Sequence, residues 1–156
     1  MPTQEPTAPQ RDGLPAGTPI DNYRITSTIA KGGFSLIYLA IDEETGDEVV
    51  IKEYLPKKLA RRDLGLNLVA LGNGLDERIH QGRKLFFQEA KTLASLRHPN
   101  IVKVLGLFLA YNTAYLVMQY QRGRNLGSYI HERKGGLSTR FIYQVFLPVL
   151  DALALI

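Results

Sequence analysis

The chain of 156 residues is long enough to bury one hydrophobic core, since 45% of its residues are hydrophobic and 22% are charged. It contains no cysteine, which excludes disulfide bonds and thiolate metal sites, and its three histidines lack the spacing of metal ligands. A net charge of +4 is too small to indicate a nucleic-acid partner, and we expect none.

Residues 1 to 21 are expected to form a disordered tail. The first 20 residues carry five prolines and have no apolar core, so they do not resemble a signal peptide. A polar, proline-rich stretch of this kind cannot bury enough surface to order itself.

The lack of cysteine is also compatible with a reducing cytoplasm, where we expect the protein.

Residues 23 to 54 form the segment around which the rest of the chain is organised. Residues 23 to 29 and 36 to 41 alternate between apolar and polar side chains, which predicts two strands separated by a glycine-containing turn. A second turn leads into a short apolar run rich in β-branched residues, which ends at Lys52. We therefore expect the ammonium group of Lys52 to lie beneath the glycine turn.

The two glycines of the first turn are compatible with a phosphate-binding loop. Gly32 and Gly33 have no Cβ to keep an anion away from their backbone N–H groups. Walker loops and dinucleotide-binding loops both open a helix, whereas a strand follows here, so neither is expected. Two interpretations remain at this point, a phosphate loop above Lys52 and an ordinary hairpin turn.

Residues 55 to 82 are longer than most connections in compact domains, and we expect them to be an insertion. Four basic residues recur in this segment at i, i+1, i+4 and i+5, a spacing that would place them on one face of a short helix. They are Lys57, Lys58, Arg61 and Arg62. Such a face is either a docking surface for an acidic or phosphorylated partner or simply a solvated surface. Further along the insertion, residues 66 to 71 are expected to form a short strand that ends at the turn Gly72-Asn73-Gly74.

Residues 83 to 97 change to helical spacing, and His98-Pro99-Asn100 ends the run. Glu89 falls within the apolar stripe of this helix. A carboxylate that faces a core needs a partner, because its desolvation is otherwise costly. Lys52 on the neighbouring sheet is the expected partner.

The remaining chain predicts two strands and two helices. Residues 101 to 109 and 114 to 120 complete a five-stranded antiparallel sheet. Residues 125 to 133 predict a short helix, and Ser138 is the expected N-cap of the last one. That helix, residues 141 to 156, is apolar on nearly every side and belongs inside a larger domain. A proline and an aspartate interrupt it, so it is not expected to span a membrane.

In this order the elements resemble the N-terminal lobe of protein kinases. The family pairs a G-x-G-x-x-G-x-V loop with V-A-I-K, and here Gly32 is the middle glycine and Lys52 ends V-V-I-K. The stretch F-x-x-E-A-x-x-L-x-x-L-x-H-P-N-I-V, residues 86 to 102, is similar to the kinase C-helix and the turn after it. YLVMQYQRGRNL resembles the kinase hinge. The strand end IKEYLP and the long insertion look most like bacterial serine/threonine kinases of the eukaryotic type.

The resemblance implies an α+β fold with three parts. Residues 22 to 119 would form the small lobe, with a five-stranded antiparallel sheet, the C-helix and the insertion 55 to 82. Residues 120 to 156 would form the hinge and the start of a truncated large lobe. Three positions depart from the family pattern: Ala30 and Ser35 replace two of the loop glycines, and Val50 replaces the alanine of V-A-I-K.

The resemblance also implies ATP as the ligand, with Lys52 and Glu89 pairing to hold its α- and β-phosphates. Met118 would be the gatekeeper beside the adenine, the backbones of Gln119 and Gln121 would meet the adenine edge, and Asn125 would lie near the ribose. The residues expected to contact ATP are Ile29, Ala30, Gly32, Gly33, Phe34, Ser35, Ile37, Val50, Lys52, Met118, Gln119, Gln121 and Asn125.

The kinase motifs H-R-D-x-x-x-x-N and D-F-G do not occur in the 156 residues. They supply the catalytic base and the Mg²⁺ ligands, so we expect no metal site here and no phosphoryl transfer by this chain alone. We interpret it as the N-terminal part of a serine/threonine kinase domain whose partners are ATP and a protein substrate. The alternatives are a kinase-like scaffold or pseudokinase that binds another protein, and an unrelated β-rich module. Exposed apolar surface on helix 141 to 156 is expected to drive self-association.

Overall fold

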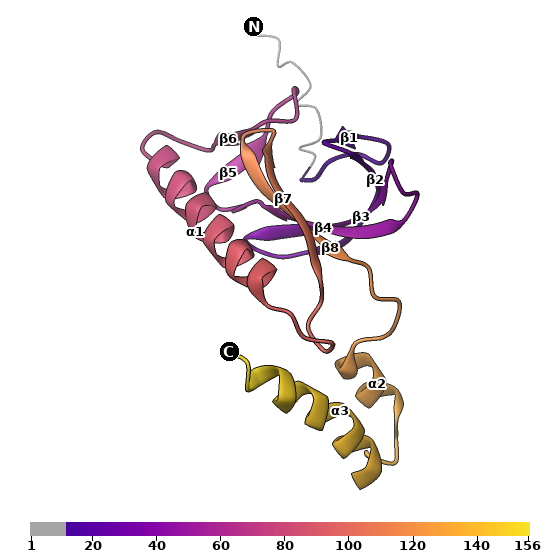
Figure 1. Ribbon diagram of the computed structural model, residues 1–156. Helices are drawn as coiled ribbons and strands as arrows, with labels where there is room; N and C mark the ends of the chain where they lie inside the picture. The colour runs from indigo at the N-terminus through magenta and orange to yellow at the C-terminus, as the bar shows by residue number, and fades with distance from the viewer. Residues whose placement is uncertain (1–11) are drawn as a thin grey trace, which may run out of the picture.

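A computed structural model describes residues 12–156, in which a twisted antiparallel sheet is flanked by one long helix (Figure 1). The strand order is β1-β2-β3-β4-β8-β7, and neighbouring strands are all antiparallel. The strands are β1 (Pro19–Ile20), β2 (Tyr23–Lys31), β3 (Ser35–Asp42), β4 (Glu48–Tyr54), β7 (Val104–Ala110) and β8 (Thr113–Gln119). The five expected strands are present, which confirms the predicted fold class, and β1 adds a short sixth.

The segment before β2 is part of the core, so the prediction of a disordered tail is wrong for residues 12 to 21. Leu14 and Ile20 are each only 3% exposed, and the backbone N–H of Leu14 donates to the hydroxyl of Tyr38 at 3.0 Å. The composition of the stretch indicated disorder, but two apolar side chains that fit against the sheet bury enough surface to order it. The rest of the predicted tail, residues 1 to 11, lies outside the described residues.

The insertion contains a two-stranded sheet, β5 (Ala60–Arg62) paired with β6 (Leu68–Ala70). β6 lies within the strand predicted over residues 66 to 71. The predicted short helix with four basic residues on one face is wrong. In a strand successive side chains point to opposite sides, so Arg61 is exposed whereas Arg62 is buried.

The tip of the hairpin between β7 and β8 forms hydrogen bonds with both the insertion and the long helix α1 (Asp76–Ser95). Tyr111 and Asn112 at its tip both have positive φ, 45° and 59°, as the two central residues of a type I′ turn do. The Asn112 side chain donates to the carbonyl of Leu68 at 2.9 Å, and Arg83 of α1 donates to the Asn112 carbonyl at 2.9 Å. The hairpin tip therefore fixes where α1 lies beside the sheet.

Helix α1 begins at Asp76, earlier than the predicted start at residue 83, and packs closely on the end of β4. Gly82 makes this approach possible, because a Cβ there would lie 2.0 Å from the hydroxyl oxygen of Tyr54. One turn further on, the Phe86 ring packs against the Tyr54 ring with 5.9 Å between centroids. Glycine in a helix has low propensity, which explains why the pattern did not predict the first two turns.

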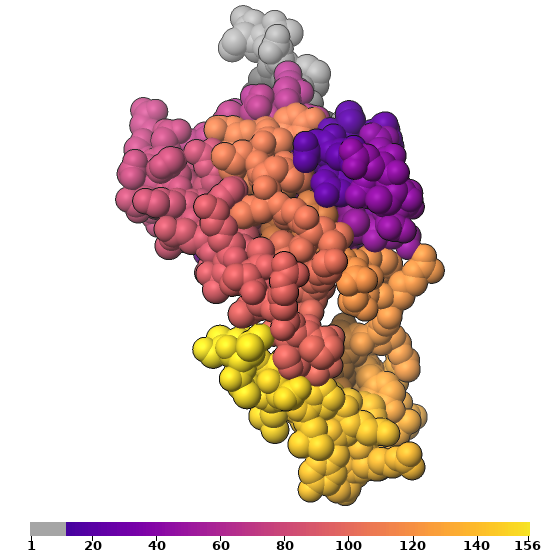
Figure 2. Space-filling model, viewed as in Figure 1, coloured from indigo at the N-terminus to yellow at the C-terminus, as the bar shows by residue number. Residues whose placement is uncertain are grey.

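Two further helices follow the sheet, α2 (Leu126–Glu132) and α3 (Thr139–Leu153). Ser138 caps α3 as predicted, accepting a hydrogen bond from the N–H of Phe141 at 3.2 Å. In Figure 2 α3 forms the lower end of the molecule. Near the C-terminal end of this helix the Asp151 carboxylate lies 3.1 Å from the His98 ring. Among the α3 side chains only Ala152 is buried. None of the helices within residues 12–156 is long and apolar enough to cross a membrane.

Candidate functional site

Lys52 belongs to a continuous patch on one face of the sheet. In the strand register Lys52 lies opposite Ile37 on β3 and opposite Leu116 on β8, and Val50 lies opposite Met118. Directly opposed residues of antiparallel strands share a face, so these five side chains are neighbours. Four of them are half-buried and Leu116 is buried. The patch is an apolar surface with one cationic group. Contacts of these residues with ATP stay predictions.

The glycine turn next to this patch is anchored by its carbonyl groups. The carbonyl of Gly33 accepts a hydrogen bond from the N–H of Lys57 at 3.1 Å, and the carbonyl of Phe34 accepts one from the N–H of Leu55 at 2.8 Å. The loop tip is thus tied to the first residues of the insertion. Phe34 is 70% exposed, and a Cβ added at Gly33 would meet no heavy atom within 4 Å, so the tip has open space around it.

The predicted ion pair between Lys52 and Glu89 is not formed in this structure. No ion pair among residues 12–156 joins the two, and Glu89 is exposed. The ammonium group of Lys52 lies instead over the ring of Phe86, 5.7 Å from its centroid, a geometry that allows a cation–π contact. An exposed carboxylate is solvated and needs no partner, which removes the physical reason for the predicted pair. The roles of both residues in binding phosphates stay predictions.

The remaining predicted contact residues follow the chain from the glycine turn to the hinge. Ala30 lies opposite Ile37 at the end of β2, and Ile29 beside it is 49% exposed. At the end of β8 the N–H of Gln119 donates to the carbonyl of Lys103 at 2.9 Å. Gln121 is exposed in the segment that leads to α2.

Asn125, predicted to lie near the ribose, has a structural role in this fold. Its side chain accepts a hydrogen bond from the N–H of Ser128 at 2.7 Å and caps the N-terminus of α2. A contact with a ribose stays a prediction.

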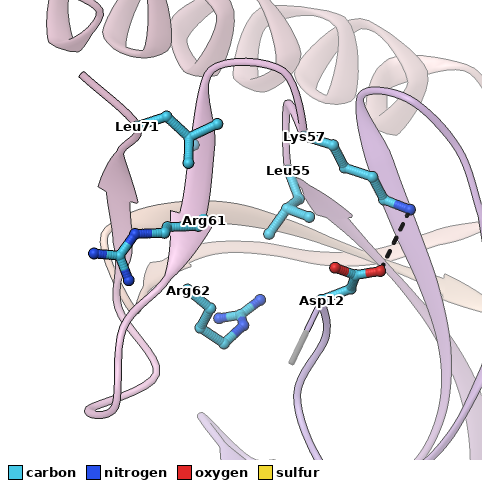
Figure 3. A pocket seen from close by; sticks show the side chains of 7 residues that line it. Asp12, Leu55, Lys57, Arg61, Arg62 and Leu71 are labelled. Carbon is cyan, nitrogen blue, oxygen red and sulfur yellow. Dashed lines mark ion pairs between the residues drawn. The ribbon is translucent and has the colours of Figure 1, made fainter. Parts of the chain in front are cut away.

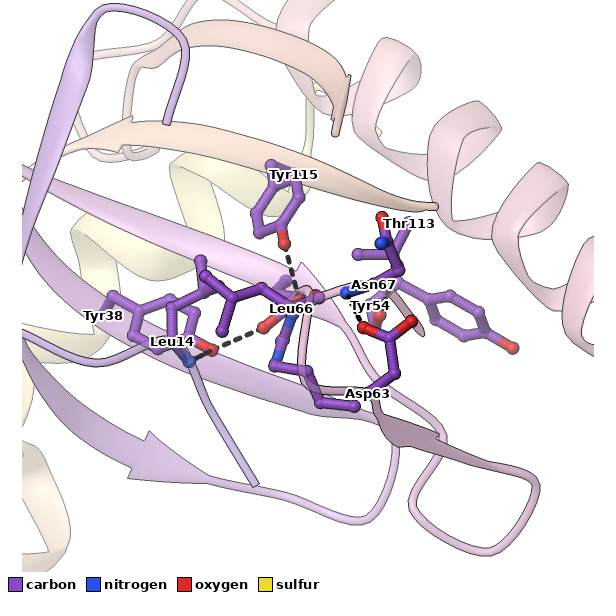
Figure 4. A network of polar contacts seen from close by, with 10 residues as sticks. Leu14, Tyr38, Tyr54, Asp63, Leu66, Asn67, Thr113 and Tyr115 are labelled. Carbon is purple, nitrogen blue, oxygen red and sulfur yellow. Dashed lines mark hydrogen bonds and ion pairs between the residues drawn. The ribbon is translucent and has the colours of Figure 1, made fainter. Parts of the chain in front are cut away.

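The opposite face of β4 carries a buried charged network that the sequence analysis missed (Figure 4). The Glu53 carboxylate accepts hydrogen bonds from Arg62 at 2.5 Å and from the hydroxyls of Tyr115 at 2.7 Å and Tyr38. Figure 4 shows Tyr38 and Tyr115 pointing toward the centre of this network from their strands. The side chains of Glu53 and Arg62 are both 0% exposed. The network holds the insertion, the N-terminal segment and the sheet together.

The buried network shifts the pKa of its members in the direction that keeps the charges paired. Burial raises the pKa of Tyr38 and of Tyr115, and the Glu53 carboxylate raises both further, so the hydroxyls stay protonated donors. Burial alone would lower the pKa of Arg62, but the Glu53 carboxylate more than offsets this and the pKa is raised. A signal was present in the sequence, because strand alternation puts Glu53 on the same face as the apolar Val49 and Ile51.

The residues present fit the nucleotide part of a kinase ligand and not its metal. The apolar patch around Val50, the accessible glycine turn and the partly exposed ammonium of Lys52 would hold an adenine and phosphates. Within residues 12–156 no three histidine or carboxylate side chains gather closely enough to hold a metal ion. Mg²⁺ ligands are oxygen atoms, and the described part of the chain brings no cluster of them to this face.

Comparison with known proteins decides the family. The family model described as the protein kinase domain matches residues 23–156. The chain belongs to the protein kinase family. The solved structure titled "PpkA-294 apo form" superposes with a TM-score of 0.85 at 29% sequence identity, covering 91% of this chain and 50% of that one. This kinase chain therefore shares its fold with about half of that solved chain.

Curated relatives of this kinase chain are protein kinases, and they include serine/threonine-protein kinases. It is 32% identical over 129 residues to the LRR receptor-like serine/threonine-protein kinase RGI1 of Arabidopsis thaliana, covering 82% of this chain and 10% of the relative. It is 30% identical over 123 residues to the carbon catabolite-derepressing protein kinase of Saccharomyces cerevisiae, covering 79% and 16% respectively. The chain thus spans between a tenth and a sixth of the length of these relatives.

Proposed function

We propose that this chain is the nucleotide-binding part of a serine/threonine kinase that transfers the γ-phosphoryl group of ATP to a protein substrate. The observation that carries the proposal is the position of Lys52, which lies in an apolar patch next to a glycine turn in a chain of the kinase family. The adenine would pack on the patch around Val50 and Met118, and Lys52 would meet the α- and β-phosphates. We further propose a cytoplasmic location.

A conformational step is part of this proposal. In the described structure the Lys52 ammonium lies over Phe86, and Glu89 is exposed. For Glu89 to pair with Lys52, α1 must turn or shift so that the Glu89 carboxylate approaches β4. A bound nucleotide would favour that position only if the pair strengthens the hold on its phosphates.

Binding of a fluorescent ATP analogue to the 156-residue chain tests the proposal. We expect saturable binding that Lys52→Ala weakens by about tenfold or more, because an ion–phosphate contact is lost. Lys58→Ala, which removes an exposed charge of the same sign, is the matched control and should bind like the original chain. Equal affinity of the Lys52→Ala variant and the original chain would contradict the proposed site. Phosphoryl transfer by this chain alone, above that of Lys52→Ala, would contradict the expected inactivity.

A kinase-like scaffold is the second candidate function, and the unpaired state of Glu89 and Lys52 favours it. The replacement of two loop glycines by Ala30 and Ser35 points the same way. A coding sequence that continues beyond residue 156 with H-R-D and D-F-G motifs supports the enzyme. A stop codon there supports the scaffold.

A further inference from the structure

The surface around α2 carries the whole net charge of the chain. Between residues 121 and 140 five side chains are cationic and one, Glu132, is a carboxylate, so this segment has a net charge of +4. The complete chain also has a net charge of +4, which means that all its other residues balance one another. The five cationic residues are all exposed, and they are Arg122, Arg124, Arg133, Lys134 and Arg140. In Figure 1 this segment lies below the sheet.

The basic residues of the insertion are arranged differently. Lys57 faces the Asp12 carboxylate, with 4.0 Å between the charged atoms, and Arg62 is buried against Glu53 (Figure 3). Arg61 and Arg62 are successive residues of β5, so their side chains point to opposite sides of the strand. The cations of the insertion are therefore divided between different surroundings, whereas those around α2 belong to one exposed segment.

Two guanidinium groups at α2 are held against one aromatic ring. The guanidinium carbon of Arg133 lies 4.7 Å from the centroid of the Tyr129 ring, and that of Arg124 lies 5.6 Å from it. Both distances are within the range of a cation–π contact. The Tyr129 ring in turn stacks on Phe141 of α3, with 4.5 Å between centroids and 10° between the ring planes. These contacts position both guanidinium groups in advance, so less side-chain entropy is lost when they bind a partner.

The chain neutralises only one of these two guanidinium groups. Arg124 donates to the Glu132 carboxylate, whereas Arg133 forms no ion pair with any residue from 12 to 156. Because both groups contact the same ring, their charges lie close together and repel one another. A carboxylate supplied from outside would reduce this repulsion, and its two oxygens match the paired donors of a guanidinium group.

A protein segment rich in carboxylates fits this surface better than a nucleic acid does. Proteins that bind single-stranded nucleic acids stack the bases on open aromatic rings. Three side chains already pack around the Tyr129 ring, so it does not offer a base such a platform. The ion pair between Arg124 and Glu132 shows instead that a carboxylate binds here.

We propose that α2 and the loop that leads to α3 dock an acidic segment of another protein. Arg124 and Arg133 are the central contacts, and Glu132 is an intramolecular competitor for them. Lys134 and Arg140 add to the positive charge that attracts the segment. None of these residues is among those expected to contact ATP, so the docking surface does not depend on the proposed nucleotide site.

Fluorescence anisotropy of a labelled peptide made of glutamate and serine, titrated with the 156-residue chain, tests the proposal. A peptide with glutamine in place of glutamate is the neutral control, and low ionic strength limits screening of the exposed charges. Arg124→Gln/Arg133→Gln should weaken binding of the acidic peptide by about three- to tenfold, because two exposed charge contacts are lost. Glu132→Gln should tighten it by about two- to threefold, because Arg124 is released.

Matched variants on α1 and in the turn after it control for net charge. Arg78→Gln/Arg97→Gln removes two exposed guanidinium groups, and Glu77→Gln removes one exposed carboxylate. Both should bind the acidic peptide like the original chain. Lys52→Ala should also leave this binding unchanged, which separates the result from the nucleotide site.

The outcomes divide as follows. Weaker binding by Arg124→Gln/Arg133→Gln together with tighter binding by Glu132→Gln, each beyond its matched control, supports the proposal. No binding of the acidic peptide, equal binding of the glutamine peptide, or effects no larger than those of the controls overturns it. A single-stranded RNA of equal charge that binds as tightly as the acidic peptide, or more tightly, also overturns it and points to a nucleic-acid surface.

Discussion

Removing the buried charge of Glu53 should destabilise the fold more than removing any exposed charge. Glu53→Gln keeps the shape of the side chain and one acceptor oxygen, but it leaves the Arg62 guanidinium without a counter-ion in a place that is 0% exposed. Breaking a buried ion pair by removing one partner costs about 3–5 kcal/mol. Solvent does not screen the attraction between the two charges, because both side chains are fully buried. Against a total stability of about 5–15 kcal/mol for a domain, this is a large fraction.

The pairing itself is tested by a double-mutant cycle. Arg62→Met replaces the guanidinium by an apolar side chain of similar length, so the double variant Glu53→Gln/Arg62→Met no longer contains an unpaired charge. We expect it to be more stable than Glu53→Gln alone, with an interaction energy of about 2–3 kcal/mol. The free energy of unfolding would be measured by urea denaturation followed by far-UV circular dichroism, at protein concentrations where the chain is monomeric.

An exposed ion pair serves as the matched control. Glu48 accepts from Arg122, whose side chain is 81% exposed, so Glu48→Gln should cost at most about 1 kcal/mol. A cost of less than about 1 kcal/mol for Glu53→Gln, or additive effects of the two substitutions in the cycle, would refute the assignment of this network as a stabilising, coupled unit.

Three further outcomes are expected. Gly82→Ala should lower the free energy of unfolding by about 1–3 kcal/mol despite the higher helix propensity of alanine, because the new Cβ would lie 2.0 Å from the hydroxyl oxygen of Tyr54. Stability should fall above about pH 10, by about 1.4 kcal/mol per pH unit for each of Tyr38 and Tyr115, since their pKa is raised in the fold and the unfolded chain then releases protons first. The chain should self-associate through α3, and Leu147→Glu should reduce the mass seen by light scattering, because that side chain is 55% exposed on an apolar helix.

Each of these outcomes has a result that contradicts it. A Gly82→Ala variant as stable as the original would mean that α1 moves away from Tyr54 at no cost. If Tyr38→Phe does not reduce the loss of stability at alkaline pH, that hydroxyl is not the titrating group. A light-scattering mass equal to one chain at all concentrations would show that the exposed face of α3 does not drive association.

Local patterns predicted the strands and the last two helices well. Alternation over residues 36 to 41 predicted β3, and the apolar run before Lys52 predicted β4. Ser138 was recognisable as a cap because the hydrogen bond it accepts comes from a residue three positions later. The start of α1 was missed because Gly82 is explained only by a contact with Tyr54, far away in the sequence.

The site was predicted in part. The face that carries Lys52, Val50 and Met118 follows from strand register, and register follows from the alternation of side chains. The partner of Lys52 does not, because it depends on how α1 packs against the sheet. That packing places Phe86 near the ammonium group and leaves Glu89, three residues later, in solvent.

The sequence by itself predicted five strands along the chain, the glycine turn and the lysine strand, and it carries the match to the protein kinase family. Only the tertiary structure decided which face of β4 is covered, and by what. Strand alternation separates Lys52 from Glu53 but does not say which segment packs on either side. Leu14 reaches Tyr38 and Tyr115 reaches Glu53 from segments distant in the chain, and burial against such segments is what turns an ordinary surface carboxylate into the centre of a buried network.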